Sequence, residues 1–213
     1  MKQSKLLGYY NYTVVLTYIG MLTGFIGIVL AFEGNLFNSI ICLMIAGFCD
    51  MFDGAIASTN KKRTEQEKCF GIQIDSLSDL ICFGVLPASI VYSISDKNSI
   101  VLAISAMYVL SALIRLAYFN VDEQDRQKKC SGPRELYYGL PVTLSALIIP
   151  IVYGITTLFS LDMRIPVTVS LFVTGILFLL PFPLKKPKII GKICVLVCGL
   201  VEVLLMVFVC LDV

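Results

Sequence analysis

Long apolar runs separated by short polar segments form the dominant pattern of this chain. Residues 11–32, for example, contain no charged side chain. Each run suits the ~20 residues that a helix needs to cross a bilayer. Glu202 interrupts the last run, which makes that run the weakest. The pattern predicts spans at residues 11–32, 36–57, 72–94, 99–119, 138–158, 165–183 and 190–211.

These spans define the expected fold class. We expect an all-α, polytopic membrane bundle of about seven transmembrane helices, in a single domain over residues 1–213, because no polar linker is long enough to separate two domains. The longest polar stretch, Asn120–Glu135, is expected to be a loop. The first run exceeds the ~7–15 residues of a signal-peptide core and lacks a small-residue cleavage site, so we expect a retained first helix.

Composition supports a membrane protein. Apolar residues make up 57% of the chain and charged residues 15%, with a mean hydropathy of +0.86. Soluble domains usually contain about 45–50% apolar and about 25% charged residues. The eight cysteines form no CxxC pair and histidine is absent, so neither a disulfide framework nor a zinc site is indicated. Any proton transfer must use a carboxylate, Tyr, Lys, Cys or the substrate itself.

The basic residues indicate an orientation. If the N-terminus is cytoplasmic, 15 of the 17 fall on the cytoplasmic side, and only Lys97 and Arg164 fall outside. The positive-inside rule therefore favours a cytoplasmic N-terminus. The basic loops also suit anionic lipid head groups. No aromatic-interleaved basic surface is present, so nucleic acid is not an expected partner.

Four aspartates lie at the inner edges of two adjacent spans. Asp53 and Asp75 lie about 5–6 Å inside the span ends, and Asp50 and Asp79 about 10 Å inside, at ~1.5 Å per residue. Each pair shares one helix face, because its spacing is i,i+3 or i,i+4. The two spans are antiparallel neighbours joined by a short loop. Asp50 is therefore expected level with Asp79, and Asp53 level with Asp75.

Such an acidic cluster is unfavourable by itself. An Asp in a membrane helix costs about 2.5–3.5 kcal/mol at the centre, and like charges a few Å apart cost more. Hard divalent cations such as Mg²⁺, Mn²⁺ and Ca²⁺ prefer carboxylate oxygens. Four carboxylates suit two cations and a substrate phosphate, the arrangement used for in-line displacement at phosphorus. Gly54 and Gly71 beside the acids permit a ligand to approach the backbone.

Other classes of protein also place acids in a membrane. A cation transporter more often distributes its acids across the bilayer depth, with broken helices at the midplane. A scaffold protein gains nothing from the cluster. Pro87, in the middle of the third span, removes a backbone hydrogen bond and either shapes a pocket next to Asp79 or adjusts helix packing.

The acid-bearing segments also carry a family pattern. "DMFDGAIA" followed by "GIQIDSLSD" resembles the signature of the CDP-alcohol phosphatidyltransferases, D-x-x-D-G-x-x-A-R and then G-x-x-x-D-x-x-x-D. The family's Arg is Ser58 here, and Lys61, Lys62 or Arg63 just beyond is expected to supply its positive charge. The matching positions are Asp50, Asp53, Gly54, Ala57, Gly71, Asp75 and Asp79.

The flanking segments "FGIQIDSLSDLICFGVLPA", "IRLAYFNV" and "YYGLPVT" resemble the integral-membrane phosphatidylserine synthases of bacteria and archaea, over roughly residues 10 to 190. The resemblance implies a core of six helices plus a C-terminal helix, a prokaryotic cell membrane, an active site facing the cytoplasm and a homodimer. It implies CDP-diacylglycerol and L-serine as substrates, and Mg²⁺ or Mn²⁺ as cofactors. Phosphatidylglycerophosphate synthase is the alternative within the family, and a divalent-cation transporter the alternative outside it.

The same resemblance assigns roles to residues. Asp50, Asp53 and Asp75 hold two cations, Asp79 shares one, and Asp79 accepts the proton of the attacking serine hydroxyl. The nucleotide pocket is formed by Asp53, Gly54, Ala57 and Gly71.

The position after the fourth Asp bears on the acceptor. Relatives that use phosphorylated acceptors tend to carry Lys or Arg there, whereas this chain has Leu80. An uncharged wall favours an acceptor without a phosphate, such as serine. A serine carboxylate still needs a cation, and Arg115 and Arg134 are the candidates, each equally explained as a positive-inside anchor.

Overall fold

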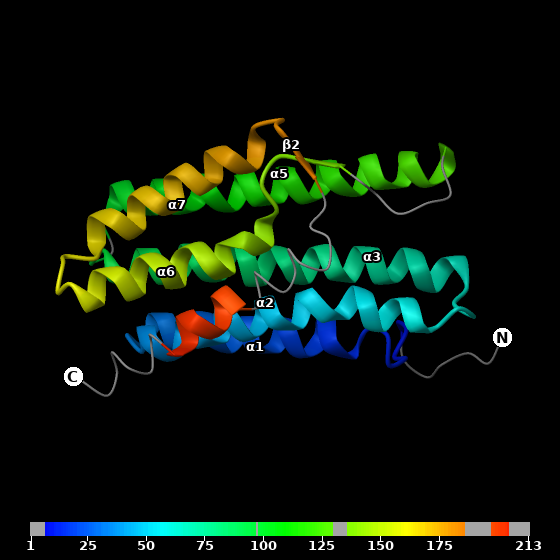
Figure 1. The fold of residues 1–213 in the computed structure, drawn as a ribbon, viewed down its shortest axis with the longest axis horizontal. Coiled ribbons are helices and arrows are strands. Elements are labelled where there is room, and N and C mark those ends of the chain that lie inside the picture. Colours follow the sequence, from blue (N-terminus) through cyan, green and yellow to red (C-terminus); the bar gives the residue numbers. More distant parts are fainter. Residues whose placement is uncertain (1–6, 97, 130–135, 186–196, 205–213) are drawn as a thin grey trace.

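A computed structural model describes residues 7–96, 98–129, 136–185 and 197–204. Helices that run along one common direction form the body of the molecule (Figure 1). Residues 197–204 are also helical, and the rest of the last expected span, 190–211, lies outside the described residues. The elements are α1 (Val15–Phe32), α2 (Leu36–Thr59), α3 (Glu65–Asp79), the π-helix η1 (Leu80–Val85), α4 (Leu86–Ile94), α5 (Ser99–Lys129), β1 (Leu136–Tyr138), the 3₁₀-helix η2 (Val142–Leu144), α6 (Ser145–Leu158), α7 (Arg164–Leu179) and β2 (Pro183–Lys185).

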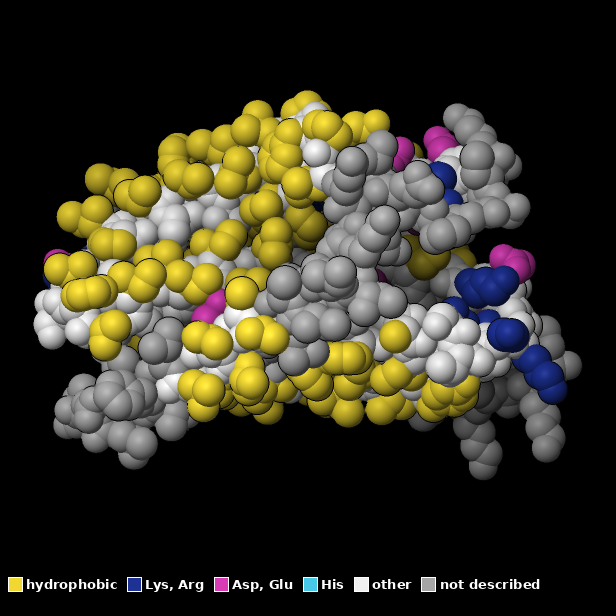
Figure 2. All heavy atoms as spheres, in the orientation of Figure 1, with side chains coloured by type: hydrophobic (Ala, Val, Ile, Leu, Met, Phe, Trp, Pro, Cys, Tyr) yellow, Lys and Arg dark blue, Asp and Glu magenta, His cyan; other side chains and the backbone are white. Residues whose placement is uncertain are grey.

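The length and apolar character of the helices confirm the expected class, an all-α membrane protein. Four of them are long and apolar enough to cross a bilayer, and two shorter apolar helices accompany them at Val142–Leu158 and Arg164–Leu179. Hydrophobic side chains cover the body in Figure 2, whereas Lys and Arg gather at one end. The four long helices are Val15–Phe32, Leu36–Thr59, Glu65–Ile94 and Ser99–Arg126.

Two features differ from the sequence-based expectation. The expected loop at residues 120–135 is wrong over residues 120–129, because α5 continues to Lys129. Glu123 and Arg126 support this extension by an i,i+3 ion pair of 2.6 Å. The sequence pattern also did not predict the antiparallel pairing of β1 with β2, because three-residue strands are too short to show an alternation of side chains.

Local hydrogen bonds determine where the two acid-bearing helices begin. Asn35 caps α2 by accepting from the Asn38 N–H. Thr64 caps α3 through a reciprocal capping box, in which its hydroxyl accepts from the Glu67 N–H and its own N–H donates to Glu67 Oε2. Helix α3 therefore starts at Glu65, and the loop between α2 and α3 is only residues 60–64.

Glycines allow α1 to pack closely on the next two spans. A Cβ added at Gly24 would lie 2.6 Å from Cys82 Sγ, and one added at Gly27 would lie 2.9 Å from Cys42 Cβ. Small residues at helix interfaces are typical of membrane bundles, because they let backbones approach. Helix α1 is consequently held against α2 and against η1.

Candidate metal and phosphate site

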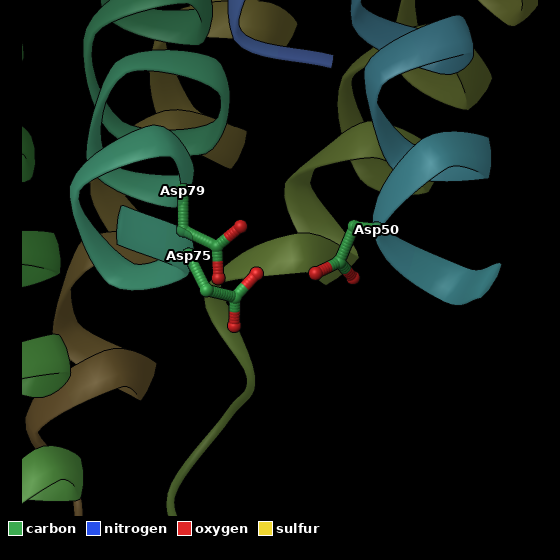
Figure 3. Close-up of side chains that lie close together, drawn as sticks. All are labelled: Asp50, Asp75 and Asp79. Carbon is green, nitrogen blue, oxygen red and sulfur yellow. The ribbon is translucent and has the colours of Figure 1, made fainter. Parts of the chain in front are cut away.

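The four aspartates converge as the sequence predicted. Helix α2 supplies Asp50 and Asp53, and helix α3 supplies Asp75 and Asp79. Carboxylate oxygens of Asp50, Asp75 and Asp79 lie within 4.8 Å of one another. Figure 3 shows Asp75 and Asp79 on one helix, facing Asp50 across the gap. Asp50 thus meets two acids that lie 25 and 29 residues further along the sequence.

The acids of α3 both lie close to Asp50 of α2. Asp50 has a carboxylate oxygen within 4.8 Å of oxygens of both Asp75 and Asp79, and Asp53 lines the same cavity. Two carboxyl groups make such contacts only if they share a proton or if a cation neutralises them, because two carboxylates repel at this distance. The acids of α2 and α3 therefore form one cluster whose charge must be neutralised.

The residues present fit a hard divalent cation. Asp75 Oδ1 is buried and has no hydrogen-bond partner in the described structure, so the oxygen is available as a ligand. Oxygen donors from several carboxylates are the set that Mg²⁺, Mn²⁺ and Ca²⁺ prefer. A small cavity lies among all four acids and is also lined by Cys82 and Phe83.

Helix α1 forms a wall of the site that the sequence reasoning missed. Thr17 donates a hydrogen bond of 3.0 Å to Asp53 Oδ2. Ser78, between the two acids of α3, donates to the Thr17 carbonyl at 3.4 Å. Thr17 and Gly20 both line the cavity. The signal was a Thr followed by Gly20, Gly24 and Gly27, which marks one close-packed face of the first span.

The residues expected around the nucleotide differ in exposure. Gly54 is exposed, and nothing lies within 4 Å of the position where its Cβ would be. Ala57 is half-buried on the same helix. Gly71, on the facing helix, has Arg63 Nη1 at 3.8 Å from its Cβ position. Open space therefore borders the acids on the Gly54 side.

The basic residues that follow α2 are not equivalent. Lys61 and Lys62 are exposed, whereas Arg63 is half-buried with its Nε enclosed and unpaired among the described residues. Ser58, at the position of the family's Arg, donates its hydroxyl to the Ala55 carbonyl at 2.6 Å. Of these residues, Arg63 is the one that turns back over α3.

Arg115 lies deep in the molecule, with 6% of its surface exposed. Its Nε donates to the Leu140 carbonyl at 3.3 Å, and its Nη2 donates to the Gly139 carbonyl at 3.4 Å. Arg115 therefore ties α5 to the turn that precedes α6. Arg134, the other acceptor candidate, lies outside the described residues. Asn120, also on α5, accepts from Ser76 at 2.9 Å, which brings α5 next to the acids of α3.

Fold and site together define an integral-membrane protein with a carboxylate cluster suited to divalent cations and phosphate. The family model of the CDP-alcohol phosphatidyltransferases matches residues 10–183. The chain therefore belongs to the CDP-alcohol phosphatidyltransferase family, as its acid-bearing segments indicated.

Relatives within this family carry serine in their names. The chain is 30% identical over 154 residues to an archaetidylserine synthase of Methanothermobacter thermautotrophicus, a match that covers 72% of this chain and 62% of that protein. It is 34% identical over 113 residues to the CDP-diacylglycerol–serine O-phosphatidyltransferase of Saccharomyces cerevisiae, covering 52% of this chain and 40% of the yeast protein. The enzyme of the same name from Helicobacter pylori strain 26695 is 35% identical over 102 residues, covering 47% and 39%. The matches thus span between 39% and 62% of these relatives.

Proposed function

We propose that this protein transfers the phosphatidyl group of CDP-diacylglycerol to L-serine, which produces phosphatidylserine and CMP. The observation that carries the proposal is that Asp50, Asp75 and Asp79 converge, with Asp53 lining the same cavity, in a member of a family of phosphatidyltransferases. The serine acceptor is supported by the names of the relatives and by Leu80, which offers no charge for a phosphorylated acceptor.

The four aspartates are proposed to hold two divalent cations, Mg²⁺ or Mn²⁺, and the same oxygens suit Ca²⁺. Asp50, Asp53 and Asp75 together hold the two cations, and Asp79 is a further ligand of one of them. Bound there, the cations supply positive charge that neutralises the diphosphate and the departing phosphate. The carboxylates in turn gain the counter-charge that makes their close approach favourable.

Asp79 is proposed as the general base. With no histidine in the chain, a carboxylate at the deep edge of the cavity is the suitable proton acceptor. Asp79 removes the proton of the serine hydroxyl, and the serine oxygen forms a bond to the phosphorus that carries diacylglycerol. The bond from that phosphorus to the bridging oxygen breaks, and CMP leaves with both electrons. The proton passes from Asp79 to solvent.

The nucleotide is proposed to occupy the open side of α2. Gly54 has no side chain and leaves room for the nucleotide, and the small side chain of Ala57 lies on the same face of α2. Gly71 likewise leaves room on α3. Asp53 lies at the boundary between nucleotide and cations. For the diphosphate we assign Arg63, because its guanidinium lies over Gly71, in preference to Ser58, Lys61 or Lys62.

The serine carboxylate is assigned to Arg115 or Arg134. In support, Arg115 lies on α5, and the same helix contacts α3 beside Asp75 through Asn120 and Ser76. In this role Arg115 would contact the serine carboxylate while its guanidinium is held by the carbonyls of Gly139 and Leu140.

The arrangement in the membrane follows from charge and length. We assign seven spans, the seventh of them at 190–211, in a prokaryotic cell membrane with the N-terminus and the acids on the cytoplasmic side. The basic loop between α2 and α3 adjoins the acids, which supports this orientation. A homodimer is proposed on the family resemblance alone.

An acceptor comparison tests the proposal. Purified protein with CDP-diacylglycerol and Mn²⁺ is offered serine, glycerol 3-phosphate or inositol phosphate in parallel, and CMP and lipid products are measured. We expect CMP release and phosphatidylserine with serine only. Product from glycerol 3-phosphate alone would indicate phosphatidylglycerophosphate synthesis. No CMP with any acceptor, alongside Mn²⁺ uptake into proteoliposomes, would favour a transporter.

A further inference from the structure

The third span changes its helical form directly after Asp79. Helix α3 ends at Asp79, the π-helix η1 occupies Leu80–Val85, and α4 continues from Leu86. Within this turn the Leu86 N–H donates to the Ile81 carbonyl, five residues earlier. A π turn accommodates one residue more than an α turn. It therefore rotates the residues before it by about 100° relative to those after it.

Pro87 leaves a carbonyl without its usual donor. In an uninterrupted α-helix the Phe83 carbonyl would accept from the N–H of residue 87, which proline lacks. Phe83 is buried, with 1% of its surface exposed. An unsatisfied carbonyl at membrane depth is costly, so another donor is required.

Tyr108 supplies that donor from α5. Its hydroxyl donates to the Phe83 carbonyl at 2.8 Å, a strong geometry for an O–H donor. The single hydroxyl hydrogen of Ser145, at the start of α6, is shared between the Val142 carbonyl at 2.9 Å and the Phe83 carbonyl at 3.3 Å. The Tyr108 ring is held in place by Phe178 of α7, with ring centroids 5.3 Å apart. Three helices thus fix one carbonyl of the π turn.

The anchored residue belongs to the site. Phe83 lines the cavity that contains all four aspartates, and Asp79 immediately precedes the π turn. We propose that Tyr108 is a positioning residue, whose hydroxyl holds the π turn and thereby aims the Asp79 carboxylate at Asp50 and Asp75. The inference deepens the proposed function, because it rests on the cation site assigned to those acids.

Direct Mn²⁺ binding to the purified full-length protein tests the proposal, with free Mn²⁺ measured by electron paramagnetic resonance. Tyr108→Phe removes only the hydroxyl and is expected to weaken Mn²⁺ binding about 10-fold, the effect typical of partners that orient metal ligands. The matched control is Ser105→Ala. Ser105 is also buried on α5 and donates to the Ala88 carbonyl at 3.4 Å, beyond Pro87. Its loss should leave Mn²⁺ affinity within twofold of the unaltered protein.

A second variant separates positioning from stability. Pro87→Ala combined with Tyr108→Phe returns an N–H donor for the Phe83 carbonyl. The melting temperature is expected to recover, because the N–H of residue 87 can then donate to the Phe83 carbonyl. Mn²⁺ affinity is expected to stay low, because this ordinary α-helical bond does not hold the π turn that aims Asp79. Ser145→Ala should weaken Mn²⁺ binding in the same direction by a smaller factor, and it serves as the test if Tyr108→Phe does not fold.

Unchanged Mn²⁺ affinity in folded Tyr108→Phe, or full recovery of affinity in the double variant, would overturn the positioning role. Unaltered protein that binds no Mn²⁺ would overturn both the cation site and this inference. Normal Mn²⁺ binding without phosphatidyl transfer would overturn the proposed reaction alone and leave the positioning role intact.

Discussion

The hydroxyl of Thr17 donates a 3.0 Å hydrogen bond to the Asp53 carboxylate, across the interface between α1 and α2. Both side chains are buried, with exposed fractions of 8% and 9%. This bond occupies one oxygen of Asp53 and sets the direction of the other. Partners of this kind orient ligands and are often as important as the ligands themselves.

Replacing Thr17 should therefore weaken cation binding without unfolding the protein. Thr17→Val keeps the shape and removes the hydroxyl, and we expect Mn²⁺ affinity and CMP release to fall about 10-fold. Thr23→Val is the matched control, because Thr23 is half-buried on the same helix, away from the acids, and its hydroxyl donates to the Ile19 carbonyl in the described structure. Equal effects from both variants would contradict the assigned role.

The aspartates themselves are expected to be far more sensitive. Asp50→Asn and Asp75→Asn each remove a charged ligand, and CMP release should fall about 100-fold or more, since every ~1.4 kcal/mol of lost transition-state stabilisation costs a factor of ten. Chelation of divalent cations should abolish the activity of the unaltered protein, and added Mn²⁺ should restore it. Substantial turnover by either variant would argue against a metal role.

Arg63 should affect the nucleotide substrate selectively. Its guanidinium lies over Gly71, whereas Lys61 and Lys62 are exposed. Arg63→Ala is expected to raise the KM for CDP-diacylglycerol about 10-fold, because a charge-assisted hydrogen bond to phosphate is lost. Lys61→Ala and Lys62→Ala should change it less than twofold. Kinetics with varied CDP-diacylglycerol at saturating serine distinguish these cases, and a larger effect from either lysine would refute the assignment.

Gly54 offers a substitution that separates binding from folding. No atom lies within 4 Å of its Cβ position, so Gly54→Leu should fold, with stability raised by about 1 kcal/mol through better helix propensity. The new side chain would occupy the proposed nucleotide pocket, and CDP-diacylglycerol binding should fall at least 10-fold. Ala55→Leu, exposed at the next position, is the control. Unimpaired binding by Gly54→Leu would exclude this face as the pocket.

Gly139 should be required for the fold. Its φ is +75°, and an added Cβ would lie 2.9 Å from the Leu180 carbonyl oxygen. Gly139→Ala is therefore expected to destabilise the protein by about 1–3 kcal/mol. In the helical interior of α6, Gly154 has open space around it, and Gly154→Ala should be neutral or stabilising by about 0.5–1 kcal/mol. Thermal unfolding in detergent compares the two.

Much of the candidate site follows from the sequence, because helical periodicity places residues of suitable spacing on one face of a helix. The i,i+3 and i,i+4 spacings predicted that Asp50 and Asp53 share one helix face, as do Asp75 and Asp79. The short connection between the helices predicted that they are antiparallel and that the two faces meet. Thr17 was not identified, since its contact with Asp53 joins segments 36 residues apart and depends on how closely α1 packs. The short β1–β2 pair was missed for a similar reason, because its pairing is entirely non-local.

The sequence by itself determined the helical membrane class, the acids that face one another and the positive loop beside them, because hydropathy, periodicity and charge act locally along the chain. Only the tertiary structure decided which polar groups surround those acids. The Phe83 carbonyl meets Tyr108, Arg115 meets the carbonyls of Gly139 and Leu140, and Arg63 lies over Gly71. Each of these contacts depends on the rotation and separation of packed helices, which no local pattern of residues specifies.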